Sequence, residues 1–169
     1  MKLLRLAVII FISLICINCS VKYSFTGASI STKTKSFQVN YFQNNSTLVE
    51  PGIDRDFTNK LIDLLINQTS LELVKAKGDL IFEGEIVEYR ISPTTATANN
   101  TAAQNRLTIG INVRFFDKND SESDFEKRFS FYYDFPGSSQ LIGSLKETAV
   151  DEIFERITQD IFNEALAKW

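Results

Sequence analysis

Two long stretches of this sequence alternate between apolar and polar side chains with few exceptions, and a short polar turn separates them. They are RLTIGINVRFF, residues 106–116, and DFEKRFSFYYDF, residues 124–135. Alternation with a period of two over so many residues predicts two β-strands, each with one apolar face that other parts of the chain must cover. The inward positions are Leu107, Ile109, Ile111, Val113 and Phe115 in the first strand and Phe125, Phe129, Phe131, Tyr133 and Phe135 in the second.

Two amphipathic helices are predicted to provide that cover. The first spans residues 54–68, where the acidic side chains of its first turn suit the positive end of the helix dipole. The second runs from about Ser144 to Lys168. The apolar stripes consist of Phe57, Leu61, Leu64 and Leu65 in the first helix, and of Val150, Ile153, Phe154, Ile157 and Ile161, widened by Phe162, Leu166 and Trp169, in the second.

Further strands precede the alternating pair. The segment SFQVNYF alternates, with Phe37, Val39 and Tyr41 on one side, and a short strand is an option at residues 71–74. In DLIFEGEIVEYRI the apolar positions change side, which predicts a β-bulge, with Gly84 as its expected place. The order is β-α-β-β-β-α, and the predicted fold is α+β: a two-layer sandwich with two helices packed on one face of a four-stranded, mostly antiparallel sheet.

The segment between two of the strands, SPTTATANNTAAQN at residues 92–105, has no charge and no large apolar side chain. This composition is typical of a mobile loop, and long loops in compact domains are often functional. A solvated loop without a role remains the alternative.

The N-terminus predicts export and lipid attachment. A short basic start precedes LAVIIFISLICI, an uncharged run that is too short to span a membrane and is typical of a secretory signal. We expect residues 1–18 to be removed and Cys19 to be acylated, as in bacterial lipoprotein signals, although Cys16-Ile17-Asn18 departs from the usual lipobox. Ordinary secretion with a free Cys19 and a non-cleaved anchor remain alternatives.

Residues 19–36 are predicted to form a tether that starts to pack at Tyr23 and Phe25, and residues 37–169 a single domain. The whole chain has a net charge of −3, and cleavage of the signal would make it more acidic by removing Lys2 and Arg5. A nucleic-acid-binding protein would instead be basic, so this class is excluded.

The chain contains no histidine, which removes the commonest general base and the usual nucleophile pairs and zinc ligands. We therefore expect no enzyme activity and no cofactor or metal. The carboxylates Glu83, Glu85 and Glu88 are more simply explained by the solvent face of a strand than by a catalytic pair, and DKNDSESD by a hydrated turn than by a calcium loop.

With this pattern in place, the chain resembles the lipopolysaccharide-assembly family LptE. The strings that carry the resemblance are CSVKYSFTGASI, VNYFQNN, GDLIFEGEIVEY and TAAQNRLTIGINVRF. The resemblance implies an outer-membrane lipoprotein, anchored by its acyl chains on the periplasmic side. Such a protein would plug and help assemble the LptD-type β-barrel and assist lipopolysaccharide transport to the outer leaflet. The alternative is a periplasmic envelope lipoprotein that regulates an envelope enzyme or a secretion complex without a barrel partner.

Contacts to the barrel or to lipopolysaccharide are expected at the loop of residues 94–105 and at the polar face of the sheet. Because lipopolysaccharide carries phosphates beside acyl chains, its binder should offer Arg or Lys next to apolar surface. For each cation taken singly, a solvated or locally paired charge is the alternative. The candidate residues are Arg90, Asn105, Arg106, Arg114, Lys127 and Arg128.

Overall fold

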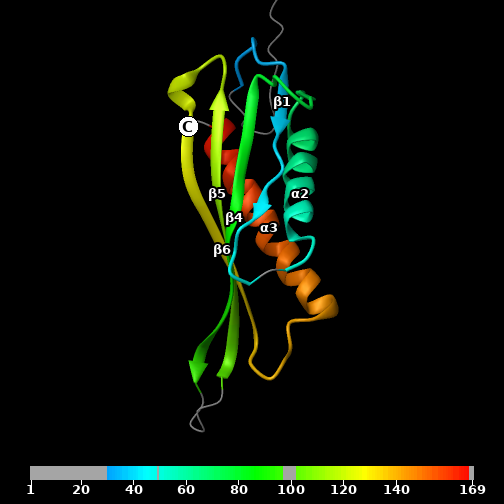
Figure 1. Ribbon diagram of the computed structural model, residues 1–169, viewed down its shortest axis with the longest axis vertical. Coiled ribbons are helices and arrows are strands. Elements are labelled where there is room, and N and C mark those ends of the chain that lie inside the picture. The colour runs from blue at the N-terminus through cyan, green and yellow to red at the C-terminus, as the bar shows by residue number, and fades with distance from the viewer. Residues whose placement is uncertain (1–29, 49, 97–101, 168–169) are drawn as a thin grey trace, which may run out of the picture.

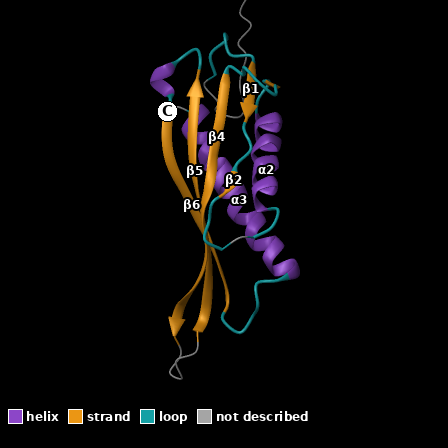
Figure 2. Ribbon diagram, in the orientation of Figure 1, coloured by secondary structure: helices purple, strands orange, loops and turns teal. Residues whose placement is uncertain are grey.

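The computed structural model describes residues 30–48, 50–96 and 102–167. This part of the chain forms one twisted sheet, and two helices pack against one side of the sheet (Figures 1 and 2). The helices are α2 (Ile53–Gln68) and α3 (Gly143–Leu166). The strands are β1 (Ser36–Val39), β2 (Gln43–Asn44), β3 (Glu72–Leu73), β4 (Leu80–Ala96), β5 (Ala102–Asp117) and β6 (Phe125–Pro136), and a short 3₁₀ turn, η2 (Ser121–Ser123), lies between the last two.

The predicted α+β two-layer fold is confirmed, but within the described residues the sheet has six strands rather than four. Its order is β3-β1-β4-β5-β6, and β2 also pairs with β4. The two strands that the sequence pattern did not count, β2 and β3, have two residues each, too few for alternation to be recognised, although a short strand had been an option where β3 lies. The long pairings β4–β5 and β5–β6 are antiparallel, whereas β1, β2 and β3 join in parallel.

The core lies between the sheet and the helices and is rich in phenylalanine. The Phe57 ring of α2 stands edge-on to Phe42 and to Phe154 of α3, with ring centroids 5.0 Å and 5.1 Å away. All five inward positions predicted for β5 are buried, and of those predicted for β6 Phe129 and Phe135 are buried. Both helices bury most of their predicted stripes, although Leu64 and Val150 are only partly buried and Trp169 lies outside the described part. The helix-covered side is therefore the face that the alternation marked.

Two details of the strands differ from the sequence pattern. Tyr41 is 55% exposed, and Phe42 is fully buried in its place. The reason is that β1 ends at Val39, and the Asn40 amide then donates to the Phe82 carbonyl, which moves the chain out of strict alternation. The bulge in β4 lies between Ile86 and Glu88 and not at Gly84, so Tyr89 returns to the buried side.

The loop predicted for residues 92–105 is wrong at both flanks. The strands β4 and β5 continue as a paired hairpin as far as Ala96 and Ala102, with Pro93 opposite Asn105, and only residues 97–101 lie outside the described part. Small and β-branched residues can extend a ladder that longer apolar strands have already started. The hairpin reaches beyond the helices at the lower end of the molecule in Figure 1.

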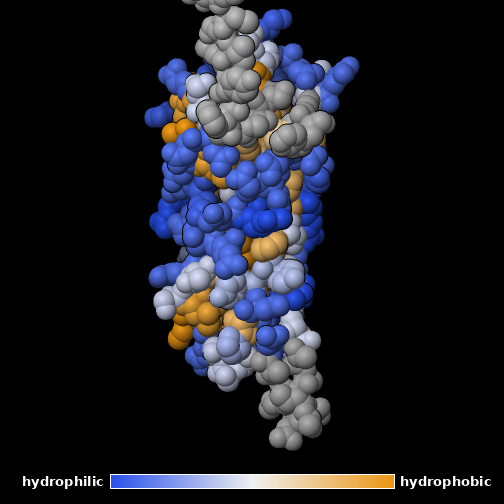
Figure 3. Space-filling model, turned by 180° about the vertical axis from the view of Figure 1, so that it is seen from behind, coloured by the Kyte–Doolittle hydropathy of each residue, from blue (hydrophilic) through white to orange (hydrophobic). Residues whose placement is uncertain are grey.

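The predictions for Cys19, Tyr23 and Phe25, and for the signal and most of the tether, fall on residues outside the described part. Within that part, neither helix is both long and apolar enough to cross a bilayer. Viewed from behind, the side on which the helices lie is mainly hydrophilic, with smaller apolar groups visible toward both its upper and its lower end (Figure 3).

Candidate interaction face

The side of the sheet that faces away from the helices carries a continuous field of charged and polar groups, which we call the open face. In the described part of the chain no helix packs on it (Figure 1). Its side chains come from the alternate positions of β4, β5 and β6 that the core does not use. They are Glu83, Glu85, Glu88 and Arg90 of β4, Arg106, Thr108, Gly110, Asn112 and Arg114 of β5, and Glu126, Arg128, Ser130, Tyr132 and Asp134 of β6.

Arg114 joins the upper part of β5 to β4. Its guanidinium donates to Glu83 at 3.1 Å and to Glu85 at 3.2 Å, and these hydrogen bonds raise the pKa of Arg114. Asn112 donates a further bond to Glu85 at 3.3 Å. The two carboxylates that could suggest a glycosidase pair are therefore held by one arginine, which favours a structural role for them.

Glu88 receives two arginines in the middle of the face. Arg90 of the same strand lies 2.8 Å away, and Arg128 reaches it at 2.5 Å from β6, across the whole width of β5. The crossing is possible because Gly110 lies beneath the Arg128 guanidinium, where an added Cβ would come within 2.9 Å of its Nη2. Two cations share one carboxylate here, so this part of the face has local excess positive charge.

At the lower part of the face Arg106 forms a two-pronged pair with Asp134, at 2.7 Å and 2.8 Å. These hydrogen bonds lower the pKa of the Asp134 carboxyl and raise that of Arg106. The same guanidinium lies 3.6 Å from the ring centroid of Tyr132, which is 46% exposed. The alternation places Tyr132 on the polar face, but Tyr132 is not among the six predicted contact residues. Folding the hairpin about its turn would have placed it diagonally opposite Arg106.

A groove of about 460 Å³ borders the open face where β4 runs past the end of β2. Arg90 and Glu88 line it together with Leu48 and Ile91, which are 52% and 45% exposed. Tyr89 forms part of the wall, and burial raises its pKa to about 12. An arginine beside exposed aliphatic groups suits a ligand with both an anionic and an apolar part.

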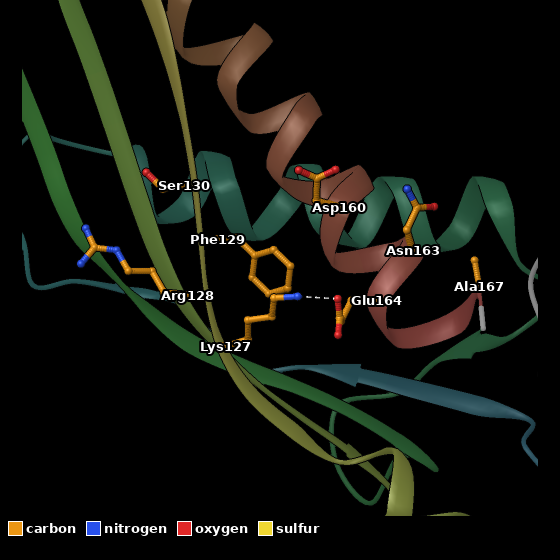
Figure 4. Close-up of a pocket in the computed structure, with 8 residues that line it drawn as sticks. All are labelled: Lys127, Arg128, Phe129, Ser130, Asp160, Asn163, Glu164 and Ala167. Carbon is orange, nitrogen blue, oxygen red and sulfur yellow. Dashed lines mark hydrogen bonds and ion pairs between the residues drawn. The ribbon is translucent and has the colours of Figure 1, made fainter. Parts of the chain in front are cut away.

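The six predicted contact residues do not lie together. Arg90, Arg106, Arg114 and Arg128 share the open face, but only Arg90 and Arg106 are near the extended hairpin. Asn105 pairs with Phe135, on the helix-covered side. Lys127 also lies on that side, where its ammonium contacts Glu164 of α3 at 2.6 Å (Figure 4).

Beside Lys127, a second groove of about 580 Å³ separates β6 from the C-terminal half of α3. In the close-up of Figure 4, Lys127 and Phe129 point toward α3 while Arg128 and Ser130 point away from it. Asp160, Asn163 and Ala167 form the helix wall of this groove. Among the described residues, no acidic or cysteine side chains are grouped so as to hold a metal ion.

Comparisons with known proteins agree with this architecture. The family model described as LptE, lipopolysaccharide-assembly, matches residues 34–165. No curated protein matches the sequence.

Solved structures share the fold at low identity. The hypothetical protein CT253 from Chlamydia trachomatis is 10% identical with a TM-score of 0.52, over 75% of this chain and 93% of that chain. Protein XCC0632 from Xanthomonas campestris is 11% identical with a TM-score of 0.50, over 77% and 84% of the two chains. The rare lipoprotein B from Shewanella oneidensis is 12% identical with a TM-score of 0.47, over 75% and 89%. At these identities the likeness to CT253 and XCC0632 concerns the fold alone, and the likeness to the rare lipoprotein B carries no argument.

Proposed function

The chain belongs to the LptE lipopolysaccharide-assembly family, and from that premise we propose that it is a lipid-anchored protein of the outer membrane that plugs and helps assemble an LptD-type β-barrel. In this role it faces the periplasm and assists the passage of lipopolysaccharide to the outer leaflet. It acts by binding and not as an enzyme.

The observation that carries this proposal is the open face of the sheet. Each of its arginines pairs with a carboxylate of the same face, so the face is polar and close to neutral while exposing Tyr132 and Arg90. The interior of an outer-membrane barrel is polar and hydrated, and a face of this kind can fit against such a wall without burying unpaired charge.

We propose that lipopolysaccharide binds in the groove at the edge of β4. The phosphates of lipopolysaccharide would contact Arg90, and its acyl chains would contact Leu48 and Ile91, which line the same groove. Arg90 is the most suitable cation because it shares Glu88 with Arg128, whereas Arg106 and Asp134 neutralise each other.

Attachment to the membrane is proposed to occur through acyl chains on Cys19. Two or more chains would hold the protein at a bilayer without a spanning helix. A Cys19→Ala variant should then lose the acyl mass and leave the membrane fraction. An unchanged mass and unchanged fractionation would rule out lipidation.

The barrel partnership is tested by co-purification in detergent from cells that express the tagged full chain. We expect the wild type to bring down one large outer-membrane barrel in equal amounts, and Arg106→Ala/Tyr132→Ala to reduce its recovery at least about tenfold, as loss of a central arginine–aromatic anchor would. The matched control is Lys60→Ala/Asp151→Ala, which removes an exposed ion pair between α2 and α3 on the other side of the molecule. This control should keep full recovery.

Recovery of the wild type as a free monomer, together with normal surface lipopolysaccharide after depletion, would contradict the barrel role. It would favour an envelope lipoprotein that regulates an enzyme or a secretion complex. Equal loss of the barrel in both double variants would show that the open face is not the contact.

The lipopolysaccharide groove is tested separately with the purified protein. Arg90→Gln should weaken binding of lipopolysaccharide about tenfold, since a charged hydrogen bond contributes roughly that factor. Arg55→Gln on α2 is the control, because Arg55 is also exposed and paired with a neighbouring acid, Asp56. Equal affinity of the two variants would remove the groove from the proposal and leave the barrel role untouched.

A further inference from the structure

The outer edge of β6 has no strand partner in the part of the chain that the structure describes. Its other edge pairs with β5 through twelve consecutive residue pairs without a bulge, from Gln104 opposite Pro136 to Phe115 opposite Phe125. Every second residue of β6 therefore directs its backbone N–H and C=O away from the sheet. An edge of this length is a template for a further strand unless the protein covers it.

The side chains along this edge are also incompletely covered. Phe125, Phe131 and Tyr133 point to the helix side but are only partly buried, although their neighbours on β5 are fully buried. The groove of Figure 4, between β6 and α3, is lined by the residues of β6 that lie between Phe125 and Phe131, from Lys127 to Ser130. An added strand would fill this groove and complete the apolar layer at the edge of the sheet.

Charged residues protect only the first part of the edge. Glu126, Lys127 and Arg128 follow Phe125, and charged side chains of this kind oppose strand addition. The following residues, FSFYYDF at 129–135, are rich in aromatic side chains and contain a single charge. A segment of this composition has high β-propensity and gains from a partner strand.

The described chain begins at the same end of the molecule as β6. Ile30 lines a small cavity together with Ser123, Ala165 and Leu166, next to the turn that leads into β6. Nearby, Asn119 of that turn donates to the Thr34 hydroxyl at 3.0 Å. A segment that precedes Ile30 therefore starts within a few residues of the first residue of β6.

The sequence before Ile30 has the pattern of an edge strand. In SVKYSFTGAS, residues 20–29, Val21, Tyr23 and Phe25 alternate with polar residues. The five steps from Phe25 to Ile30 span about 17 Å when extended, which is close to the roughly 20 Å that six extended steps from Ser123, at the end of η2, to Phe129 would span.

We propose that residues 21–28 of this chain add to the outer edge of β6 as an antiparallel strand. The register that matches the apolar sides places Phe25, Tyr23 and Val21 opposite Phe129, Phe131 and Tyr133. The added side chains then lie over the groove beside α3, and the polar Ser24 and Thr26 extend the open face. The edge is covered by the chain itself, and docking depends neither on a barrel nor on lipopolysaccharide.

The consequence concerns orientation. In the docked strand, residue 28 lies near the start of β6 and residue 21 lies toward the turn after Pro136. The N-terminal end of the segment therefore lies toward the extended hairpin. If Cys19 is acylated, as proposed above, that end faces the membrane. An undocked tether would instead leave from the opposite end, beside Ile30.

The test is residue-resolved amide hydrogen exchange of β6 in the full chain purified in detergent. The variant Ser24→Pro/Thr26→Pro removes the two backbone donors that this register directs at Ser130 and Arg128 of β6, and with them the fit of the segment to a ladder. The control Ser24→Ala/Thr26→Ala alters the same segment but keeps its backbone donors and apolar side chains. We expect the outward amides of Phe129–Phe135 to exchange at least about tenfold faster in the proline variant than in the wild type, and the control to match the wild type.

Equal exchange of these amides in all three proteins would overturn the proposal. If they are protected in all three and the purified protein is a dimer, the edge is occupied by a second copy, which also overturns it. A spin-label pair provides the second readout, with labels at Val21→Cys and either Ser121→Cys or Ser139→Cys in a chain carrying Cys16→Ser and Cys19→Ser. Docking predicts the shorter distance to position 139, and a shorter distance to position 121 would contradict it.

Discussion

The two sides of the sheet are built from the same strands but differ in the side chains that they carry. On the helix side the alternate residues are phenylalanine, isoleucine, leucine and valine, and many of them are fully buried. On the open face the intervening residues are charged or polar, and its arginines form ion pairs whose members are at least partly in contact with water. The helix side thus accounts for the stability of the domain, whereas the open face keeps its order through pairs that cost little to disturb.

This difference indicates which side is available to a partner. Burial of a large apolar side chain contributes about 1.5–3 kcal/mol, whereas an exposed ion pair contributes about 0–1 kcal/mol. Changes on the open face can therefore alter recognition without unfolding the protein, whereas truncation of the buried side chains on the helix side costs several times more stability. The following predictions, in order of decreasing effect, would break or sharpen this contrast.

The largest effect is expected in the core. Phe57→Ala removes the ring that links Phe42 to Phe154 and should lower the free energy of unfolding by about 3–5 kcal/mol. Ile66→Ala on the same helix is the control, because Ile66 is 49% exposed and should cost less than about 1 kcal/mol. Urea denaturation followed by circular dichroism measures both, and similar costs would contradict the assignment of stability to the helix side.

Two glycines allow the same substitution on opposite sides of the sheet. At Gly84 an added Cβ would lie 2.0 Å from the Asn112 carbonyl oxygen and 2.7 Å from the Phe42 ring. Because the clash is with backbone and a buried ring, Gly84→Ala should destabilise the protein by about 2–3 kcal/mol.

At Gly110 the neighbour is instead the movable guanidinium of Arg128. Gly110→Ala should cost less than about 1 kcal/mol and displace Arg128 from Glu88. Thermal unfolding of the two variants gives the comparison. A cost at Gly110 equal to that at Gly84 would show that the open face is as rigid as the core.

The pair Arg106–Asp134 tests how much the open face itself contributes. A double-mutant cycle with Arg106→Ala and Asp134→Ala should give a coupling energy of about 0.5–1 kcal/mol, toward the upper end for an exposed pair because the contact is two-pronged. In 1 M salt the coupling should fall, since the pair is screened. A coupling above about 2 kcal/mol would place the open face among the main sources of stability.

The smallest effect is a dependence on pH. Hydrogen bonds from Arg106 lower the pKa of Asp134 in the folded state, so its contribution is fully present above the unfolded value of about 3.9. It is lost as the pH falls below that value and through the lower folded pKa, where the carboxyl takes up a proton. The difference in unfolding free energy between wild type and Asp134→Asn should therefore shrink below about pH 4, and a constant difference across this range would contradict the assignment.

The alternation of β5 and β6 was enough to predict the buried side of both strands, and the apolar stripes were enough to place α2 and α3 within about two residues of their ends. The same alternation also puts Lys127 on the side of Phe125 and Phe129, and Asn105 on the side of Leu107, so their place on the helix side could have been predicted. The position of the bulge in β4 could not, because Gly84 and Val87 both suit a break in alternation.

The sequence by itself determined which side of each long strand is apolar, which segments form helices to cover it, and the family to which the chain belongs, because periodicity and local propensity are properties of neighbouring residues. Only the tertiary structure decided that Arg128 reaches Glu88 over Gly110, that Arg106 meets Asp134, and that Leu48 comes to lie beside Arg90. These contacts depend on the register between strands, and that register is set by turns and by a bulge that lie far from the contacting residues. A shift of one residue would move the strand side chains to the other face of the sheet.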